Sequence, residues 1–281
     1  MTTVLLVRHG LTAVTGTILL GWTPGVGLDE RGAAQASALA TRLAGIPLTA
    51  IVSSPLDRCQ QTADAIAQRR PAAVIEEGSG GACQDVVVDE RFGEVRYGDW
   101  TGQQLAVLAK DPLWAVVQSH PSAVVFPGPE GEALRDTQAR SVAAVRAWNE
   151  RLGPKATWLL CSHGDVIRTI VADALGMHLD LYHRITIEPC SLTVIHYGER
   201  LPLVRRLNDV GGDVTDLLPP PPGTARPASA DSATSESATS ESATSENAAS
   251  PTGADGHPPD LGGLIGGGAG TWTPPPAAGP A

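Results

Sequence analysis

Two stretches of the chain repeat one design, in which a short apolar run ends in a His-Gly pair and leads into a turn or helix. The first is residues 4–7 followed by Arg-His-Gly at 8–10, and the second is residues 158–161 followed by Ser-His-Gly at 162–164. Short apolar runs of this kind indicate buried, parallel strands. Parallel sheets bind ligands at the carboxyl ends of their strands. The sequence therefore predicts two histidines side by side over one crevice. Arg8, next to the first of them, is suited to binding a phosphoryl group.

Between and after these stretches, predicted helices and strands alternate. Residues 50–53 and 86–88 indicate strands, and 191–197 with 201–207 indicate a hairpin. Helices are predicted over 29–44, 54–69, 103–118, 130–152 and 166–175. Ser54-Pro55 has the pattern of an N-cap followed by the first helical residue, and Asp165 is placed to cap the last helix. The alternation predicts an α/β three-layer sandwich, with a mostly parallel central sheet and helices on both faces.

Composition divides the chain near residue 217. From there Pro, Ala, Ser, Thr and Gly dominate, and Ser-Ala-Thr-Ser-Glu occurs three times between residues 232 and 246. Few large apolar residues follow, so burial cannot offset the entropy of ordering the chain. We therefore expect one folded domain over residues 1–216 and a disordered tail over 217–281.

The net charge of −10 is divided equally between the expected folded domain and the tail, since the tail carries six acids and one base. Neither part has the basic surface expected of a nucleic-acid-binding protein. The four cysteines show no zinc or redox spacing, and no signal peptide or membrane-spanning stretch is visible. We expect a cytoplasmic protein with buried free thiols, no membrane association and no nucleic-acid partner.

Two further elements carry chemistry. In the first, strand 50–53 runs through Ser54-Pro55 into a predicted helix, which places Arg58 near the sheet edge that also carries His9. In the second, Glu94 precedes a Gly-x-Trp-x-Gly loop at 98–102 that can lie over a pocket.

With these residues in hand, the chain resembles the histidine phosphatase superfamily, which includes cofactor-dependent phosphoglycerate mutase and related phosphatases. The resemblance covers roughly residues 3–212 and rests on four motifs in the family's order. They are Arg-His-Gly at 8–10, the Ser-Pro-Leu-x-Arg-x-x-Gln-Thr-Ala run at 54–63, Glu94 with its glycine loop, and Ser-His-Gly at 162–164. It implies a phosphoglycerate mutase-like fold.

The resemblance also implies roles for these residues. His9 would be the nucleophile and form a phosphohistidine. Arg8, Arg58 and His163 would hold the phosphoryl oxygens, with His163 acting as an imidazolium. Glu94 would protonate the leaving alcohol and later accept a proton from water, which requires a raised pKa. No metal or other cofactor is implied.

The motifs depart from the family pattern around the substrate. Leu11 replaces a glutamate after the first His-Gly, and Thr15 stands where many members carry a phosphate-contacting asparagine, so Thr15 is a candidate phosphate ligand. Thr12 is retained, and Trp22 and Thr23 lie in the following glycine-rich loop. These three are candidates for the substrate pocket. A later Gly-Glu-Ser element reads Gly-Glu-Ala at 131–133.

Three functions are compatible with this pattern. We favour a metal-independent phosphatase acting on small phosphorylated metabolites. A phosphomutase of the phosphoglycerate mutase type would use the same machinery, but it needs more basic residues, and the chain has only two lysines. A non-catalytic module that binds a phosphorylated ligand is the third. The sequence leaves the physiological substrate and homo-oligomerisation open.

Overall fold

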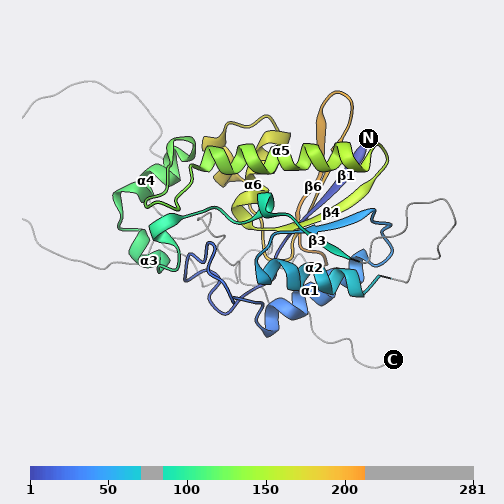
Figure 1. Cartoon of the computed structure of the whole chain (residues 1–281), viewed down its shortest axis with the longest axis horizontal. Helices are drawn as coiled ribbons and strands as arrows, with labels where there is room; N and C mark the ends of the chain where they lie inside the picture. The colour runs from blue at the N-terminus through green and yellow to red at the C-terminus, as the bar shows by residue number, and fades with distance from the viewer. Residues whose placement is uncertain (71–84, 213–281) are drawn as a thin grey trace, which may run out of the picture. The chain divides into compact units, whose positions relative to one another are not determined.

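The computed structural model describes residues 1–70 and 85–212. Within them six strands form one sheet in the order β3-β2-β4-β1-β5-β6 (Figure 1). The first four strands in this order are parallel, β5 pairs antiparallel with β1, and β6 pairs antiparallel with β5. The bounds are β1 Thr2–Arg8, β2 Ala50–Ser53, β3 Val86–Val88, β4 Thr157–Ser162, β5 Leu192–Tyr197 and β6 Pro202–Asp209. The predicted mostly parallel sheet is confirmed, and the predicted tail lies outside the described residues.

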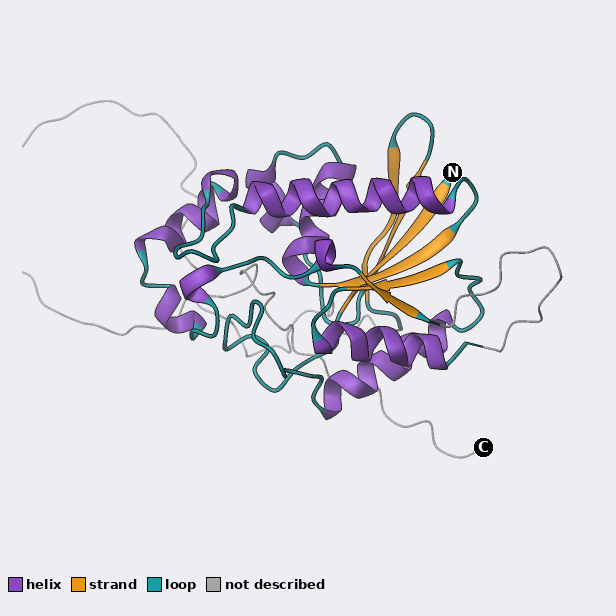
Figure 2. Cartoon of the chain, in the orientation of Figure 1, coloured by secondary structure: helices purple, strands orange, loops and turns teal. Residues whose placement is uncertain are grey.

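Helices cover both faces of the sheet, as the three-layer prediction requires. Helices α1 and α2 lie on one face and α5 and α6 on the other (Figures 1 and 2). The helical bounds are α1 Glu30–Leu43, α2 Asp57–Gln68, α3 Leu105–Leu108, α4 Pro112–Ser119, α5 Leu134–Leu152 and α6 Gly164–Ala174. Short 3₁₀ turns are η1 Glu90–Phe92, η2 Gly98–Trp100, η3 Pro121–Ala123 and η4 Leu179–Arg184.

The alternation of side chains along β1 divides the core into two parts. Val4 and Leu6 pack with residues of α5 and α6, whereas Leu5 and Val7 pack with residues of α1 and α2. Because successive side chains of a strand point to opposite faces, a continuous apolar run supplies both cores at once.

Two of the predicted helices are shorter than the sequence indicated. The helix expected over 103–118 is divided into α3 and α4, because Pro112 begins a new helix and the Asp111 carboxylate accepts from Leu113 N at 2.9 Å. Helix α5 begins four residues later than predicted. Its expected first turn instead makes isolated bridges, Tyr97 with Gly131 and Val125 with Ala133.

Both predicted N-caps were wrong. Helix α2 begins after Leu56, which makes no side-chain cap bond, and the Ser54 hydroxyl lies 2.7 Å from His163 Nε2 instead. Helix α6 begins directly after His163. Asp165 therefore lies inside its first turn, where its carboxylate accepts a hydrogen bond from Tyr97. In each case the polar side chain bonds a residue distant in the sequence instead of the helix end that the local pattern predicted.

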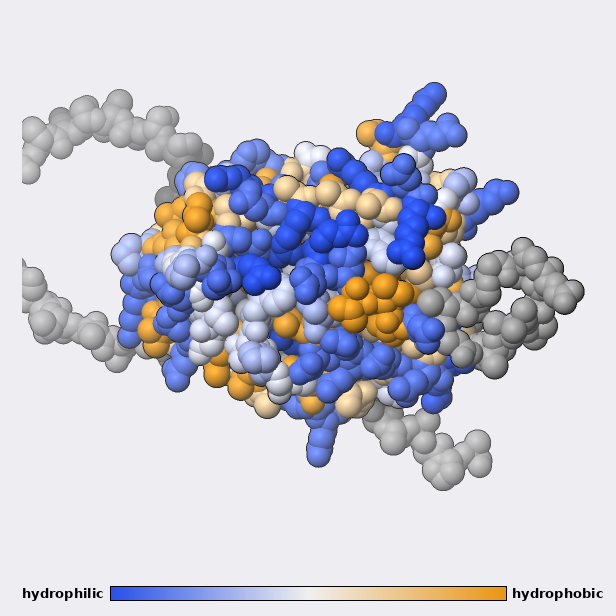
Figure 3. Space-filling view, viewed as in Figure 1, coloured by the Kyte–Doolittle hydropathy of each residue, from blue (hydrophilic) through white to orange (hydrophobic). Residues whose placement is uncertain are grey.

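On the face shown in Figure 3 hydrophilic residues dominate, and apolar residues form separate groups. Exposed apolar side chains occur on both edge strands, including Val87 and Val88 of β3 and Leu203 and Leu207 of β6. Among the described helices, none has both the length and the apolar character needed to cross a bilayer.

The turn after β1 packs tightly on the start of α1. Leu11 O accepts from Asp29 N at 3.0 Å, and Leu11 N donates to Gln35 Oε1 at 3.1 Å. A Cβ atom on Gly32 would overlap the backbone of Leu11, and one on Gly10 would lie 2.6 Å from Gly32 O. The two glycines allow this close approach of backbones, which holds the Arg-His-Gly turn against α1.

We expect Gly32→Ala to destabilise the protein, although alanine ordinarily stabilises a helix relative to glycine by up to about 1 kcal/mol. The overlap with Leu11 should lower the free energy of unfolding by about 1–3 kcal/mol, measured by urea denaturation. Gly45→Ala is the control, because its Cβ would meet no atom within 4 Å. A Gly32→Ala variant as stable as the wild type would contradict this packing.

Candidate active site

The parallel register of β1 and β4 brings the two predicted histidines together. Arg8 lies opposite Ser162, and His9 N continues the ladder by donating to Ser162 O at 3.0 Å. The rings of His9 and His163 follow at the strand ends, with centroids 5.3 Å apart and an interplanar angle of 63°. Both side chains are buried. The two histidines of the predicted pair therefore lie side by side at the strand ends.

The hydrogen bonds of His9 fix its tautomer. Its Nδ1 lies 2.7 Å from Gly10 O, and a carbonyl oxygen can only accept, so Nδ1 carries the hydrogen. Nε2 then holds the lone pair, which accepts from Arg58 Nε at 3.3 Å. Burial, followed by the charges of Arg58 and Arg8, lowers the pKa of His9 well below its usual value. His9 is thus a neutral imidazole with a basic nitrogen in the site.

Arg58 lies in the first turn of α2 and joins both histidines. Its Nη2 donates to Gly21 O at 2.9 Å and lies 3.3 Å from His163 Nδ1. Its Nη1 is buried and has no hydrogen-bond partner among the described residues. A buried guanidinium donor without a partner is costly, and an anionic oxygen would satisfy it. Arg8 is also buried, with Nη1 donating to Ile187 O at 2.7 Å.

His163 is neutral in this arrangement, which corrects the expected imidazolium. Burial, followed by the charges of Arg58 and His9, lowers its pKa well below the usual value. Because Arg58 can only donate, His163 Nδ1 accepts, and Nε2–H donates to the Ser54 hydroxyl. A phosphoryl dianion beside these groups would favour the protonated form again.

Glu94 lies beside His163 and is also buried. Its Oε2 is 3.7 Å from His163 Nδ1, and its Oε1 accepts from Val95 N at 3.0 Å. Burial, followed by the charge of Asp165, raises the pKa of Glu94 to about 7. Since the pKa of His163 is lowered, its imidazole carries no charge and the contact is not an ion pair. The pKa of Glu94 is thus raised, as expected, and burial and the charge of Asp165 raise it without any contribution from a substrate.

A buried polar group lies behind Glu94. Asp165 accepts from the Tyr97 hydroxyl at 2.7 Å and from Arg168 Nη1 at 3.0 Å. Arg168 Nε donates to Ile185 O at 2.8 Å. Asp165 is fully buried, so its charge reaches Glu94 with little screening. Proximity to this second acid helps Glu94 to keep a proton at neutral pH.

These groups meet at a narrow cavity of about 20 Å³. Thr15 is on its wall, and the other lining residues are Arg8, His9, Ile18, Leu19, Leu20, Gly21, Arg58, Glu94 and Tyr97. Thr12, Trp22 and Thr23, expected to line the substrate pocket, are not on this wall. The Thr12 and Thr15 hydroxyls bond each other at 2.9 Å, Trp22 Nε1 donates to Glu94 O, and the Thr23 hydroxyl donates to Leu20 O.

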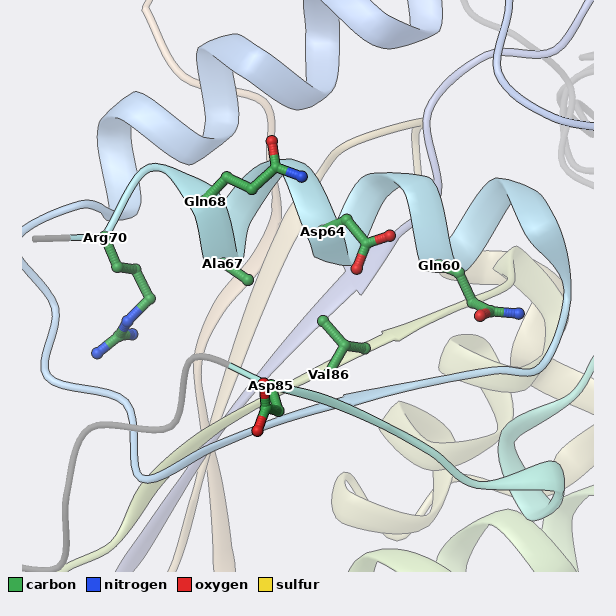
Figure 4. A pocket seen from close by; sticks show the side chains of 7 residues that line it. All are labelled: Gln60, Asp64, Ala67, Gln68, Arg70, Asp85 and Val86. Atoms are coloured by element: carbon green, nitrogen blue, oxygen red, sulfur yellow. The ribbon is translucent and has the colours of Figure 1, made fainter. Parts of the chain in front are cut away.

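A larger cavity of about 520 Å³ lies between α2 and β3 (Figure 4). The side chains that line it include Gln60, Asp64, Gln68 and Asp85. None of its lining residues belongs to the histidine cluster, by which we mean His9, His163 and the adjoining Arg8, Arg58 and Glu94. Two of its lining residues, Arg70 and Asp85, are the last and first described residues on either side of the sequence gap at 71–84. Size therefore does not identify the site here, and the smaller cavity holds the chemically suited groups.

Sequence reasoning missed several residues at this site. Ser54 and Asp165 carried a signal, but it was interpreted as helix capping. Tyr97 stood directly before the Gly-x-Trp-x-Gly loop without a role of its own. Ile18 and Leu20 gave no signal, because an apolar residue in a loop does not show that it faces a cavity.

Comparison with known sequences places the chain among phosphate-processing proteins. The model of the histidine phosphatase superfamily (branch 1) matches residues 4–210. A probable phosphoglycerate mutase GpmB of Cronobacter sakazakii is 29% identical over 202 residues, which cover 71% of this chain and 86% of that protein. A protein of the same name from Escherichia coli is 28% identical over 219 residues, covering 77% and 95%.

Solved structures show the same fold. Bacillus stearothermophilus YhfR is 26% identical with a TM-score of 0.63, covering 75% of this chain and 98% of that one. A mycobacterial glucosyl-3-phosphoglycerate phosphatase, solved as complexes with VO3, is 25% identical with a TM-score of 0.61, covering 74% and 98%. A phosphoserine phosphatase of Entamoeba histolytica in complex with 3-phosphoglyceric acid is 24% identical with a TM-score of 0.63, covering 74% and 98%, and shares the fold.

Glu94→Gln should stabilise the protein at pH 8 but not at pH 5. Glu94 has a pKa raised from 4.5 to about 7 in the folded state, so its favourable contribution is complete below pH 4.5 and is lost as the pH rises through 7. Glutamine stays neutral and avoids this loss, which is at most about 3 kcal/mol. Thermal unfolding at both pH values measures the difference. An equal effect of the substitution at pH 5 and pH 8 would show that the pKa is not raised.

Proposed function

This chain belongs to the histidine phosphatase superfamily (branch 1), and from that premise we propose that it hydrolyses small phosphomonoesters through a phosphohistidine. The observation that carries the proposal is the tautomer of His9. Its Nδ1–H is committed to Gly10 O, so Nε2 carries the lone pair, which accepts from Arg58 Nε and lies among the cations that would hold a phosphoryl group. A neutral imidazole with a fixed lone pair is a competent nucleophile.

In the first step His9 Nε2 attacks phosphorus, and the bond from phosphorus to the ester oxygen breaks. Glu94 gives its proton to the departing alcohol oxygen. In the second step Glu94 takes a proton from water, whose oxygen attacks the phosphohistidine, and phosphate leaves while His9 regains its lone pair. Arg8 and Arg58 offset the charge on the phosphoryl oxygens throughout, which is the main requirement of phosphoryl transfer.

The environment of the site suits this cycle. A pKa near 7 for Glu94 matches a group that must act as acid and then as base at neutral pH. Arg8 and Arg58 supply fixed positive charge, so we propose that the reaction needs no metal ion. Thr15, on the cavity wall, is a further candidate contact to the phosphoryl group.

The residues of the cavity wall favour hydrolysis over a mutase reaction, in which the phosphoryl group would be transferred back to another position of the substrate. A mutase of this family must retain a bisphosphate, whose second anionic group needs its own cations. On the wall the cationic side chains are Arg8 and Arg58, which the reacting phosphoryl group would occupy, and Ile18, Leu19 and Leu20 supply apolar surface. The relatives named as probable mutases keep this alternative open to test. The poised lone pair of His9 favours both enzymes over a binding module.

His9→Ala should abolish both turnover and the phosphoenzyme. The wild type should release inorganic phosphate from an aryl phosphate in the presence of a chelator. Rapid quenching in alkaline denaturant, after mixing the enzyme with substrate labelled in its phosphoryl group, should trap a protein phosphate that is stable to base and labile to acid. His120→Ala is the control, because His120 is exposed and is not among the residues that line the histidine cavity. Loss of activity in the chelator would overturn metal independence, and an isomerised phosphate ester in place of inorganic phosphate would indicate a mutase.

Glu94→Gln should slow the enzyme according to the leaving group. For an alkyl phosphate, which needs a proton on its departing oxygen, kcat/KM should fall by about 10²–10⁴-fold. For an aryl phosphate kcat/KM should change little, because a phenolate leaves without help. The phosphoenzyme should then accumulate, since the same carboxylate activates water. Equal losses of kcat/KM on both substrates would assign the acid to another residue. Arg58→Ala serves as the contrast and should weaken both alike.

A further inference from the structure

The side chain of Arg140, on α5, binds three backbone carbonyls that flank or belong to Glu94. Its Nη1 donates to Arg91 O at 2.7 Å and to Gly93 O at 2.9 Å, and its Nη2 donates to Glu94 O at 3.0 Å. Its Nε and Nη2 also donate to the two oxygens of Glu132 at 3.1 and 2.7 Å. A guanidinium has five N–H groups, and five bonds are formed here. Arg140 is therefore fully used in holding this segment.

Glu132 holds the chain on the other side of Glu94. Its Oε1 accepts from Arg96 N at 2.8 Å, and its own N donates to Arg96 O at 2.9 Å. Although burial opposes ionisation, the bonds from Arg140 keep the pKa of Glu132 below its usual value. The pair thus fixes the backbone of residues 91, 93, 94 and 96. Glu94 lies between the carbonyls that Arg140 binds and the backbone of Arg96, which Glu132 binds.

The segment depends on these bonds because regular structure does not hold it. Residues 93–96 lie between η1 and η2, outside any helix or strand. Their neighbour Phe92 O accepts from the Ser162 hydroxyl at 2.7 Å, and Glu94 O also accepts from Trp22 Nε1 at 2.6 Å. Each of the four consecutive carbonyls of residues 91–94 therefore accepts from a side chain. Arg140 serves three of them.

We propose that Arg140 and Glu132 are a positioning pair, which holds the Glu94 carboxyl where it can transfer a proton to the leaving oxygen. The inference rests on the proposed function, since it concerns the acid of that reaction. Neither Arg140 nor Glu132 lines the cavity itself, and the wall residue that Arg140 bonds is Glu94, through its carbonyl. The contribution of the pair is therefore restricted to the step in which Glu94 takes part.

Arg140→Lys should reproduce the leaving-group pattern of Glu94→Gln in weaker form. Lysine keeps the charge, but a point donor cannot reach three carbonyls and a carboxylate together. A displacement of about 1 Å at a reacting group can cost about 10²-fold, so kcat/KM for an alkyl phosphate should fall by about 10–10²-fold. The value for an aryl phosphate should stay within about threefold of the wild type. Arg146→Lys is the matched control on the same helix, because Arg146 is exposed and pairs with Asp173 rather than with the Glu94 segment.

A double-mutant cycle separates positioning from general weakening of the fold. In the Glu94→Gln background, Arg140→Lys should cause no further loss on the alkyl phosphate, since the group it positions no longer transfers a proton. Additive losses, or equal losses on aryl and alkyl substrates, would overturn the role. Should Arg140→Lys fail to fold, Glu132→Gln provides the same comparison and should give the same alkyl-selective loss. If Glu94→Gln itself shows no leaving-group dependence, the proposed acid and its positioning pair fall together.

Discussion

The parallel register of β1 and β4 is the constraint on which the site depends. It runs from Thr3 opposite Thr157 to Arg8 opposite Ser162, and the next residue on each strand is a histidine of the cluster. A slip of one residue would turn every side chain of a strand to the other face of the sheet. That slip is forbidden by the packing of two separate cores, each filled by alternate residues of the same apolar runs. Hydrophobic packing remote from the chemistry therefore sets the distance between the two imidazoles.

The site also concentrates positive charge in a protein of net charge −10. Arg8 and Arg58 are both buried, and their bonds to Ile187 O and Gly21 O engage donors without adding a negative charge. The same burial keeps His9 and His163 neutral. The fixed charge is thus carried by guanidiniums, which do not titrate at neutral pH, while the groups that must exchange protons have pKa values that allow it. This separation of roles suits a reaction in which the phosphoryl charge persists and the proton moves.

The sequence predicted the parts of the fold that local pattern determines. Strand 50–53 has the same bounds as β2, and the histidine pairs follow the predicted strands. The prediction failed where a polar side chain had a better distant partner. Ser54 and Asp165 both stand at positions typical of N-caps, yet Ser54 bonds a histidine and Asp165 a tyrosine. Arg140 could not be found at all, because its partners are carbonyls of an irregular segment, and no residue pattern shows which side chain will reach a loop carbonyl.

The proposed nucleophile and the proposed acid are therefore held by different kinds of structure. His9 continues a strand whose backbone bonds extend into the site, so its position survives most changes of side chain. Glu94 stands on a segment whose carbonyls rely on Arg140, Ser162 and Trp22, so its position depends on a few side chains from distant elements. Chemistry that needs only the nucleophile should be robust to substitution, whereas chemistry that needs the acid should be sensitive. Substitution of these supporting residues should therefore affect mainly the turnover of phosphate esters of alcohols, because these substrates need the acid most.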